Sequence, residues 1–166
     1  MAGASPVSTG STLGAEALAL SNELSLTLRL RSPQLSAARR KAADFLDAHG
    51  VDRLCIEDVL LALTEATANA ARHSGGDVAE VKLVLLDDHV RLSVTDRGEG
   101  FAFSGVDLSR RPDLLRPCGR GLYLISSVMD SVRVEAGNGT TITMTRDLRS
   151  DACFPRGLQK LGGSPT

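Results

Sequence analysis

Aromatic side chains are scarce in this chain of 166 residues: they make up 3% of it, with no tryptophan, one tyrosine and four phenylalanines. No block of basic residues is interleaved with them, and the formal net charge is −1 with a pI near 6.3. Proteins that bind nucleic acid combine a positive surface with stacking side chains. We therefore expect no direct binding to nucleic acid.

Cysteine and long apolar runs are also lacking. Cys55, Cys118 and Cys153 are odd in number, widely spaced and without a CxxC pair, which argues against a disulfide framework or a zinc site and fits a reducing compartment. The apolar stretch in GAEALALS is far too short to span a membrane, and no export segment is recognisable. These absences predict a cytoplasmic protein that does not enter a membrane.

The length fits one globular domain with tails. Residues 1–20 are mostly Ala, Ser, Gly, Leu and Thr with little periodicity, so we expect a disordered arm that buries too little apolar surface to fold. Residues 148–166 have little pattern and are expected to form a flexible tail. The predicted domain is therefore residues 21–147.

Hydrophobic periodicity predicts the elements of this domain. Alternating leucines predict a strand at 23–31, and helical spacing predicts a helix from Ser32-Pro33 to Gly50. A second helix, at 54–73, is apolar nearly all round and should be buried. The remaining predicted elements are a hairpin turned at 87–89, a helix at 121–129, and strands at 132–136 and 141–145. Residues 98–119 are rich in Gly, Pro, Arg, Asp and Ser and predict a lid.

Glu65 and Asn69 are four residues apart and share one face of the buried helix. A carboxylate in apolar surroundings is costly unless it is paired or binds a ligand. One interpretation makes Asn69 a ligand of Mg²⁺ and Glu65 a general base that takes a proton from an attacking hydroxyl. A solvated helix rim explains this pair equally well when it stands alone.

Two glycine-rich turns accompany that pair. Asp96, with Gly98 and Gly100, suits the recognition of adenine, because a carboxylate accepts from an exocyclic amine and glycines let the backbone approach a ligand. An ordinary turn is the simpler explanation of DRGEG alone. Gly119 and Gly121 open a helix whose N–H groups can face phosphates, although the same glycines would also serve packing. Thr140 could bond the base or Asp96, or simply belong to a strand that follows a turn.

Arginines gather in and beside the predicted lid, where guanidinium groups suit a γ-phosphate but also suit a solvated loop. They are Arg110, Arg111, Arg116 and Arg120. His73 follows Glu65 by eight residues and is expected to hydrogen-bond beside the site rather than to accept phosphate. Arg39 and Arg40 could belong to a partner surface, although a solvated helix face explains them as well.

The ordered set TEATANAARHS, DRGEGF and GRGLYLI resembles the N, G1 and G2 boxes of the GHKL ATPase superfamily, especially its short anti-sigma factor serine kinases. The resemblance covers residues 24–146. It implies a Bergerat-type ATP-binding fold, an α+β two-layer sandwich in which a mixed, mostly antiparallel sheet packs on three helices beneath an ATP lid. It also implies ATP and Mg²⁺ as cofactors.

By this resemblance Glu65 is the catalytic base and Asn69 the magnesium ligand, while Asp96 contacts adenine with support from Thr140. The remaining cofactor-binding positions are Gly98, Gly100, Gly119, Arg120, Gly121 and Leu122. The arginine-rich lid leaves the contact to the γ-phosphate unassigned.

The resemblance implies an ATP-dependent serine/threonine protein kinase that phosphorylates a small STAS-type anti-sigma factor antagonist. In another state such a kinase sequesters a sigma factor, and a homodimer is expected. The alternative is a non-catalytic ATP-binding module whose ordered lid controls partner binding. A third possibility is a small ATPase, or a detached sensor-kinase domain that phosphorylates histidine in trans.

Overall fold

The computed structural model describes residues 21–98 and 120–149. The elements within these ranges are β1 (Glu23–Arg29), α1 (Gln34–Ala48), α2 (Arg53–His73), β2 (Val78–Leu85), β3 (His89–Asp96), α3 (Arg120–Val128), β4 (Ser131–Gly137) and β5 (Gly139–Asp147). The predicted arm, the lid with its three arginines, Gly100 and Gly119, and the tail beyond residue 149 lie outside them. No helix in the described ranges is both long and apolar enough to cross a bilayer.

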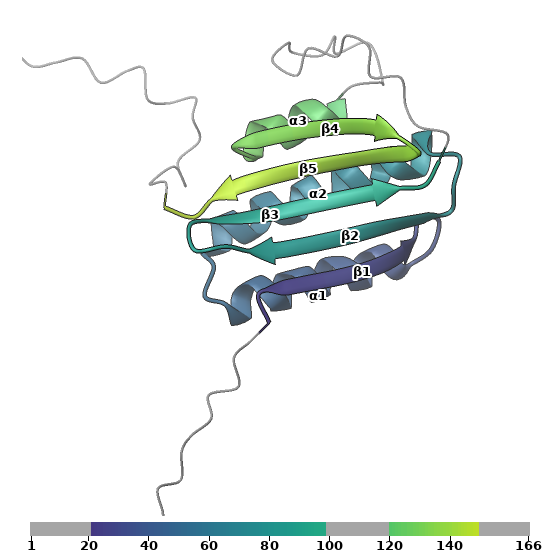
Figure 1. The fold of residues 1–166 in the computed structure, drawn as a ribbon. Coiled ribbons are helices and arrows are strands. Elements are labelled where there is room, and N and C mark those ends of the chain that lie inside the picture. Colours follow the sequence, from purple (N-terminus) through teal and green to yellow (C-terminus); the bar gives the residue numbers. More distant parts are fainter. Residues whose placement is uncertain (1–20, 99–119, 150–166) are drawn as a thin grey trace, which may run out of the picture.

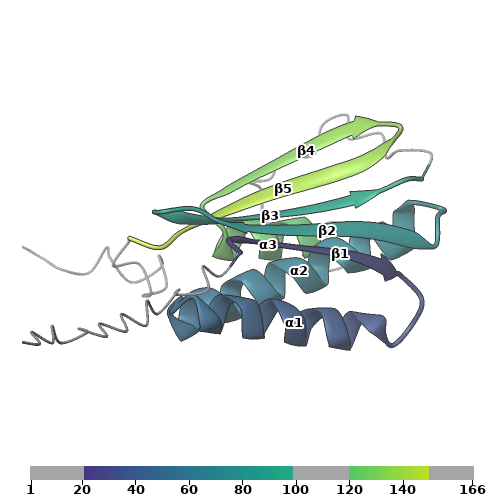
Figure 2. The same ribbon diagram turned by 60° about the horizontal axis from the view of Figure 1, so that its bottom comes forward.

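The five strands form one sheet in the order β1-β2-β3-β5-β4. All neighbouring strands in it are antiparallel, and the three helices lie together on one face, as Figures 1 and 2 show. An antiparallel sheet can leave its other face to solvent, and the burial of β2 accordingly alternates between exposed and buried residues. The predicted two-layer α+β fold is confirmed.

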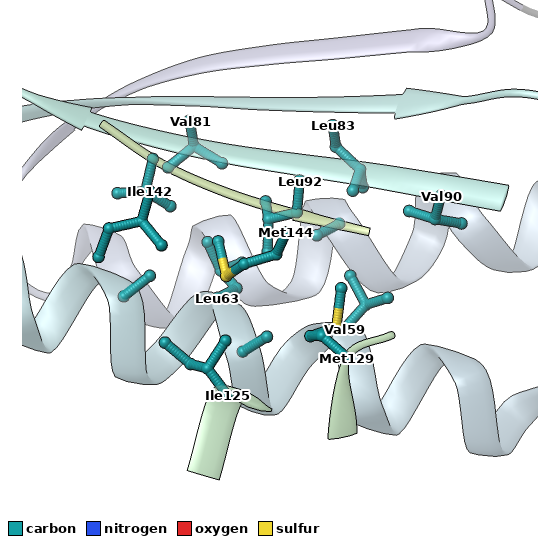
Figure 3. Packing of buried hydrophobic residues seen from close by; sticks show 14 of the residues in the cluster. Val59, Leu63, Val81, Leu83, Val90, Leu92, Ile125, Met129, Ile142 and Met144 are labelled. Carbon is teal, nitrogen blue, oxygen red and sulfur yellow. The ribbon is translucent and has the colours of Figure 1, made fainter. Parts of the chain in front are cut away.

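The core lies between the sheet and α2, which runs beneath it. Figure 3 shows side chains of α2, the sheet and α3 meeting there. Core residues that solvent does not reach at all include Val59 and Leu63 from α2, Val90 and Leu92 from β3, Met144 from β5 and Ile125 from α3. Burial of such side chains contributes on the order of 1.5–3 kcal/mol each. The apolar residues on nearly all sides of α2 are therefore explained by its place against the sheet with α1 and α3 on either side.

The element boundaries differ from the sequence prediction by at most three residues. The first helix begins at Gln34, so Pro33 takes the cap position, and the Ser32 hydroxyl still accepts from the Gln34 N–H at 3.2 Å. Gly50 follows that helix with φ +70°, a conformation that glycine adopts without strain. Asp96, predicted just past its strand, is the last residue of β3 and pairs with Thr140.

A buried arginine joins the two layers at the end of the molecule where β5 ends and α2 begins. Arg146 of β5 is 5% exposed, and its guanidinium lies 3.0 Å from Asp58 Oδ2 of α2 and 3.1 Å from Asp130 Oδ2. Burial opposes the charge of Arg146, but Asp130 and Asp58 outweigh it and raise the pKa of the guanidinium. Burial also raises the pKa of Asp58, which Arg146 only partly opposes. Arg146 thus holds two acidic groups of the helical layer against the sheet.

We expect Arg146→Met to lower the free energy of unfolding by about 3–5 kcal/mol, because two partly buried carboxylates would lose their shared cation. Asp58→Asn should cost less, since burial already disfavours the Asp58 charge. Urea denaturation followed by circular dichroism measures both. Arg133→Met, which changes a side chain that is 76% exposed, is the matched control. Equal stability of the Arg146 and Arg133 variants would contradict a structural role for the buried arginine.

Candidate functional site

Glu65 and Asn69 lie where α2 meets the first turn of α3. Both side chains are half-buried, and a Cβ on Gly121 would lie 3.0 Å from Glu65 Oε2 and 3.1 Å from Asn69 Oδ1. Because real Cβ atoms rarely come so close to a neighbour, glycine at this position lets the α3 backbone approach both polar groups. The structure therefore brings together Glu65, Asn69 and Gly121, three of the residues predicted from separate motifs.

The first turn of α3 adds a favourable field for an anion. Amide N–H groups at the start of a helix lack partners within the helix, and the helix dipole makes this end positive. Arg120, exposed at the first position of α3, adds a formal positive charge. An acid, an amide and a positive helix end thus meet at one place, which suits a phosphate held with a divalent cation.

Asp96 is buried at the end of β3, with 5% of its surface exposed. Its Oδ1 accepts from the N–H of Gly98 at 3.0 Å and from the N–H of Thr140 at 3.3 Å. Among the described residues both of these bonds end on the same oxygen, so Oδ2 is the atom that could accept from a ligand. Thr140, which the sequence suggested as a support for Asp96, provides that support through its backbone.

Gly139 allows the start of β5 to approach the end of β3. It has φ +109°, and a Cβ there would lie 1.9 Å from the carbonyl oxygen of Asp96. Beside it, the hydroxyls of Thr95 and Thr141 are 3.0 Å apart and join the same two strands. A side chain at residue 139 would therefore displace Asp96 or the N–H that bonds to it.

The residues around Asp96 contact the end of α2, the helix that also carries Glu65 and Asn69. A Cβ on Gly98 would lie 1.6 Å from the carbonyl oxygen of Ser74, which directly follows α2. Asn69 is five residues before Ser74, or about 7.5 Å along the helix axis. Sequence reasoning missed Ser74, whose only signal is its place before two glycines in HSGGD.

The structure also describes two further residues that the sequence predicted at or beside the site, Leu122 and His73. Leu122 belongs to the hydrophobic core and is 8% exposed, so its side chain serves packing. Leu122 was predicted to contact the nucleotide, and only its backbone is left to make such a contact. His73 is exposed at the end of α2. In the described part of the chain no three His, Cys, Asp or Glu residues are grouped as a metal site.

A hollow of about 570 Å³ lies near Gly98 but is not the predicted pocket. Its lining includes Glu80 and Thr95. In β3, the side chain of Thr95 points to the sheet face opposite that of Asp96, because neighbouring residues of a strand alternate. This hollow therefore opens on the face of the sheet that the helices leave uncovered.

Exposed charges are divided between the two ends of the domain. The end with Asp96 and Asn69 carries Arg29, Arg31, Arg72, Arg97 and Arg120, and its acidic Asp77 and Glu80 are ion-paired with Arg31 and Arg97. The other end carries Asp47, Asp52, Glu57, Asp87 and Asp88, with Arg53, Arg91 and Arg149 among them. The candidate site thus lies at the more positive end of a chain whose net charge is −1.

Comparisons with known proteins agree with this geometry. The family described as histidine kinase-like ATPase domain matches residues 28–146. A serine-protein kinase RsbW from Staphylococcus aureus (strain bovine RF122 / ET3-1) is 32% identical over 108 residues, a match that covers 58% of this chain and 68% of that protein.

Solved structures with the same fold include the RsbU and RsbW domains of a Mycobacterium tuberculosis protein. The match has a TM-score of 0.59 at 27% identity and covers 76% of this chain, but this chain spans only about a third of that one, 32%. A blue-light activated histidine kinase from Erythrobacter litoralis is similar in fold alone, with a TM-score of 0.51 at 17% identity over 63% of this chain and 34% of that one. The chain therefore belongs to the histidine kinase-like ATPase domain family and is homologous to the RsbW serine-protein kinases.

Proposed function

We propose that this protein is an ATP-dependent serine/threonine protein kinase that transfers the γ-phosphate to a small STAS-type anti-sigma factor antagonist. In its other role it is an anti-sigma factor that sequesters a sigma factor, and it acts as a homodimer. The observation that carries the kinase proposal is the approach of Glu65 and Asn69 to the backbone of Gly121. Homology to serine-protein kinases supports serine or threonine, rather than histidine, as the acceptor.

The residues of α2 would act on the phosphates. Glu65 is the general base, which takes the proton from the attacking hydroxyl, and Asn69 offers its Oδ1 as a ligand for Mg²⁺. Glu65 Oε2 and Asn69 Oδ1 both lie beside Gly121, and a side-chain amide oxygen is a ligand that Mg²⁺ accepts, so Asn69 would hold the cation there. When bound, Mg²⁺ neutralises charge on the phosphates.

The residues at the end of the sheet would hold the base. Asp96 presents Oδ2 to the adenine amine, while the N–H groups of Gly98 and Thr140 fix Oδ1. Gly100, Gly119, Arg120 and the backbone of Leu122 complete the proposed set of nucleotide contacts. Most of the rate enhancement should come from positioning and charge stabilisation, since phosphoryl transfer needs little covalent help from the protein.

We expect Glu65→Gln to lower the rate of phosphate transfer by about 10²–10⁴-fold, because an amide cannot accept the proton. ATP binding should change little, since the glutamine side chain would fill the same space as the glutamate it replaces. The assay is the transfer of labelled phosphate to purified STAS-type antagonists, with acid-stable product as the sign of phosphoserine or phosphothreonine.

Glu57→Gln is the matched control, because Glu57 is an exposed glutamate of the same helix that pairs only with Arg53 among the described residues. Wild-type rates from the Glu65 variant would remove Glu65 from the role of base. Tight ATP binding by the wild type without any transfer would instead support a non-catalytic module.

We expect Asp96→Asn to weaken ATP binding by about tenfold or more, because a charged acceptor is replaced and the amide can present N–H₂ to the adenine amine. The amide oxygen can still accept from Gly98 and Thr140, so the unfolding midpoint should move little. Calorimetry with Mg²⁺ and ATP measures the affinity. Asp77→Asn, at an exposed aspartate near the same end, is the control. Unchanged ATP affinity in the Asp96 variant would show that this carboxylate does not hold the base.

A further inference from the structure

The end of α2 and the turn after β3 touch each other backbone to backbone. A Cβ on Gly98 would lie 1.6 Å from the oxygen, 2.3 Å from the carbon and 2.5 Å from the Cα of Ser74. No side chain fits in this space, and the obstructing atoms are backbone that cannot turn aside. The closest approach of these two segments is therefore set by backbone atoms rather than by a flexible side chain.

Both sides of the contact are held in place by further bonds. Ser74 is 3% exposed, and its N–H donates to the carbonyl of Ala70 at 2.9 Å. The Ser74 hydroxyl donates to the carbonyl of Gly76 and accepts from its N–H, each at 3.1 Å. On the opposite side, Gly98 donates to Asp96 Oδ1 at 3.0 Å. These bonds fix the shape of each segment where the two backbones touch.

We infer that Ser74 is a positioning residue: with Gly98 it forms a rigid joint that sets the spacing between the two halves of the nucleotide site. The inference rests on the proposed function, which assigns Glu65 and Asn69 to the phosphates and Asp96 to adenine. Asn69 precedes Ser74 by five residues on α2, and Asp96 precedes Gly98 by two. Through the joint, the position of each half determines that of the other.

The spacing that the joint sets affects the binding only of a ligand that touches both halves of the nucleotide site. Two contacts made by one molecule reinforce each other when their spacing matches that molecule, and the gain is lost when the spacing changes. Adenosine needs only the base half, and magnesium tripolyphosphate needs only the phosphate half. A changed spacing should therefore weaken ATP binding while both fragments bind nearly as before.

Gly98→Ala changes the spacing most directly. Its matched control is Gly76→Ala, because a Cβ on Gly76 would lie 3.7 Å from the Ser74 hydroxyl and 3.9 Å from the Gly98 nitrogen, at ordinary contact distances. We expect the affinity for ATP to fall by about tenfold or more in Gly98→Ala, and the affinities for adenosine and magnesium tripolyphosphate by less than about threefold. The substitution also strains the bond from the Gly98 N–H to Asp96 Oδ1, but Asp96 keeps its bond to Thr140 and its place in β3, so adenosine should lose far less affinity than ATP.

The binding of all three ligands can be followed by amide NMR shifts of the full chain, which also detect millimolar affinities. Equal weakening of ATP and both fragments would overturn the inference, because a general loss of structure acts on every ligand. ATP binding by Gly98→Ala that equals that of Gly76→Ala would overturn it as well. Absence of ATP binding by the wild type would refute the proposed function itself, so the two failures are distinguishable.

Ser74→Ala is a second test of the inference, for use if the Gly98→Ala variant does not fold. This variant removes the two bonds to Gly76 but leaves the backbone contact with Gly98 free of any clash. A looser joint should lower ATP affinity by about threefold while leaving adenosine binding unchanged, an effect that a purely structural serine would not produce. Unchanged ATP affinity in Ser74→Ala would remove Ser74 from the role.

Discussion

The packing of α2 against the sheet, with α1 on one side of it and α3 on the other, is the interaction on which the rest of the structure depends. Side chains such as Val59 and Leu63 hold the helix against the sheet, and the same helix turns Glu65 and Asn69 toward Gly121. A helix held on one side by the core cannot roll without exposing apolar surface. The hydrophobic core therefore also sets the direction of the two polar side chains.

Most of the fold was predictable because the elements carry strong periodicity. The alternating residues of β1 and the helical spacing of α2 located both within a few residues. The grouping of Glu65 with Gly121 was expected only through the resemblance, since the two are distant in sequence. Gly98 was expected to allow the close approach of a ligand, but its contact with Ser74 could not be predicted, because the backbone of Ser74 makes it and the side-chain type of Ser74 gives no signal for it. The same is true of Arg146, whose burial depends on Asp58 and Asp130 from other elements.

Membership of the family accounts for the fold and indicates the general chemistry. The geometry of this chain shows, in addition, how the parts of the candidate site are connected. Gly121, Gly98 and Gly139 each allow a backbone to come where a side chain would collide. All three contacts involve a residue of the candidate site or of its support. At these three positions glycine therefore serves the close approach of backbone rather than flexibility.

The division of exposed charge along the domain has a consequence for encounter with small anions. Net charge alone would predict weak repulsion of a polyanion such as ATP. In the described part of the chain, exposed arginines predominate at one end and exposed aspartates at the other, and such a division of charge favours the approach of an anion to the arginine end. The proposed site would then face the anion before contact, and this preference fades as added salt shortens the range of the field.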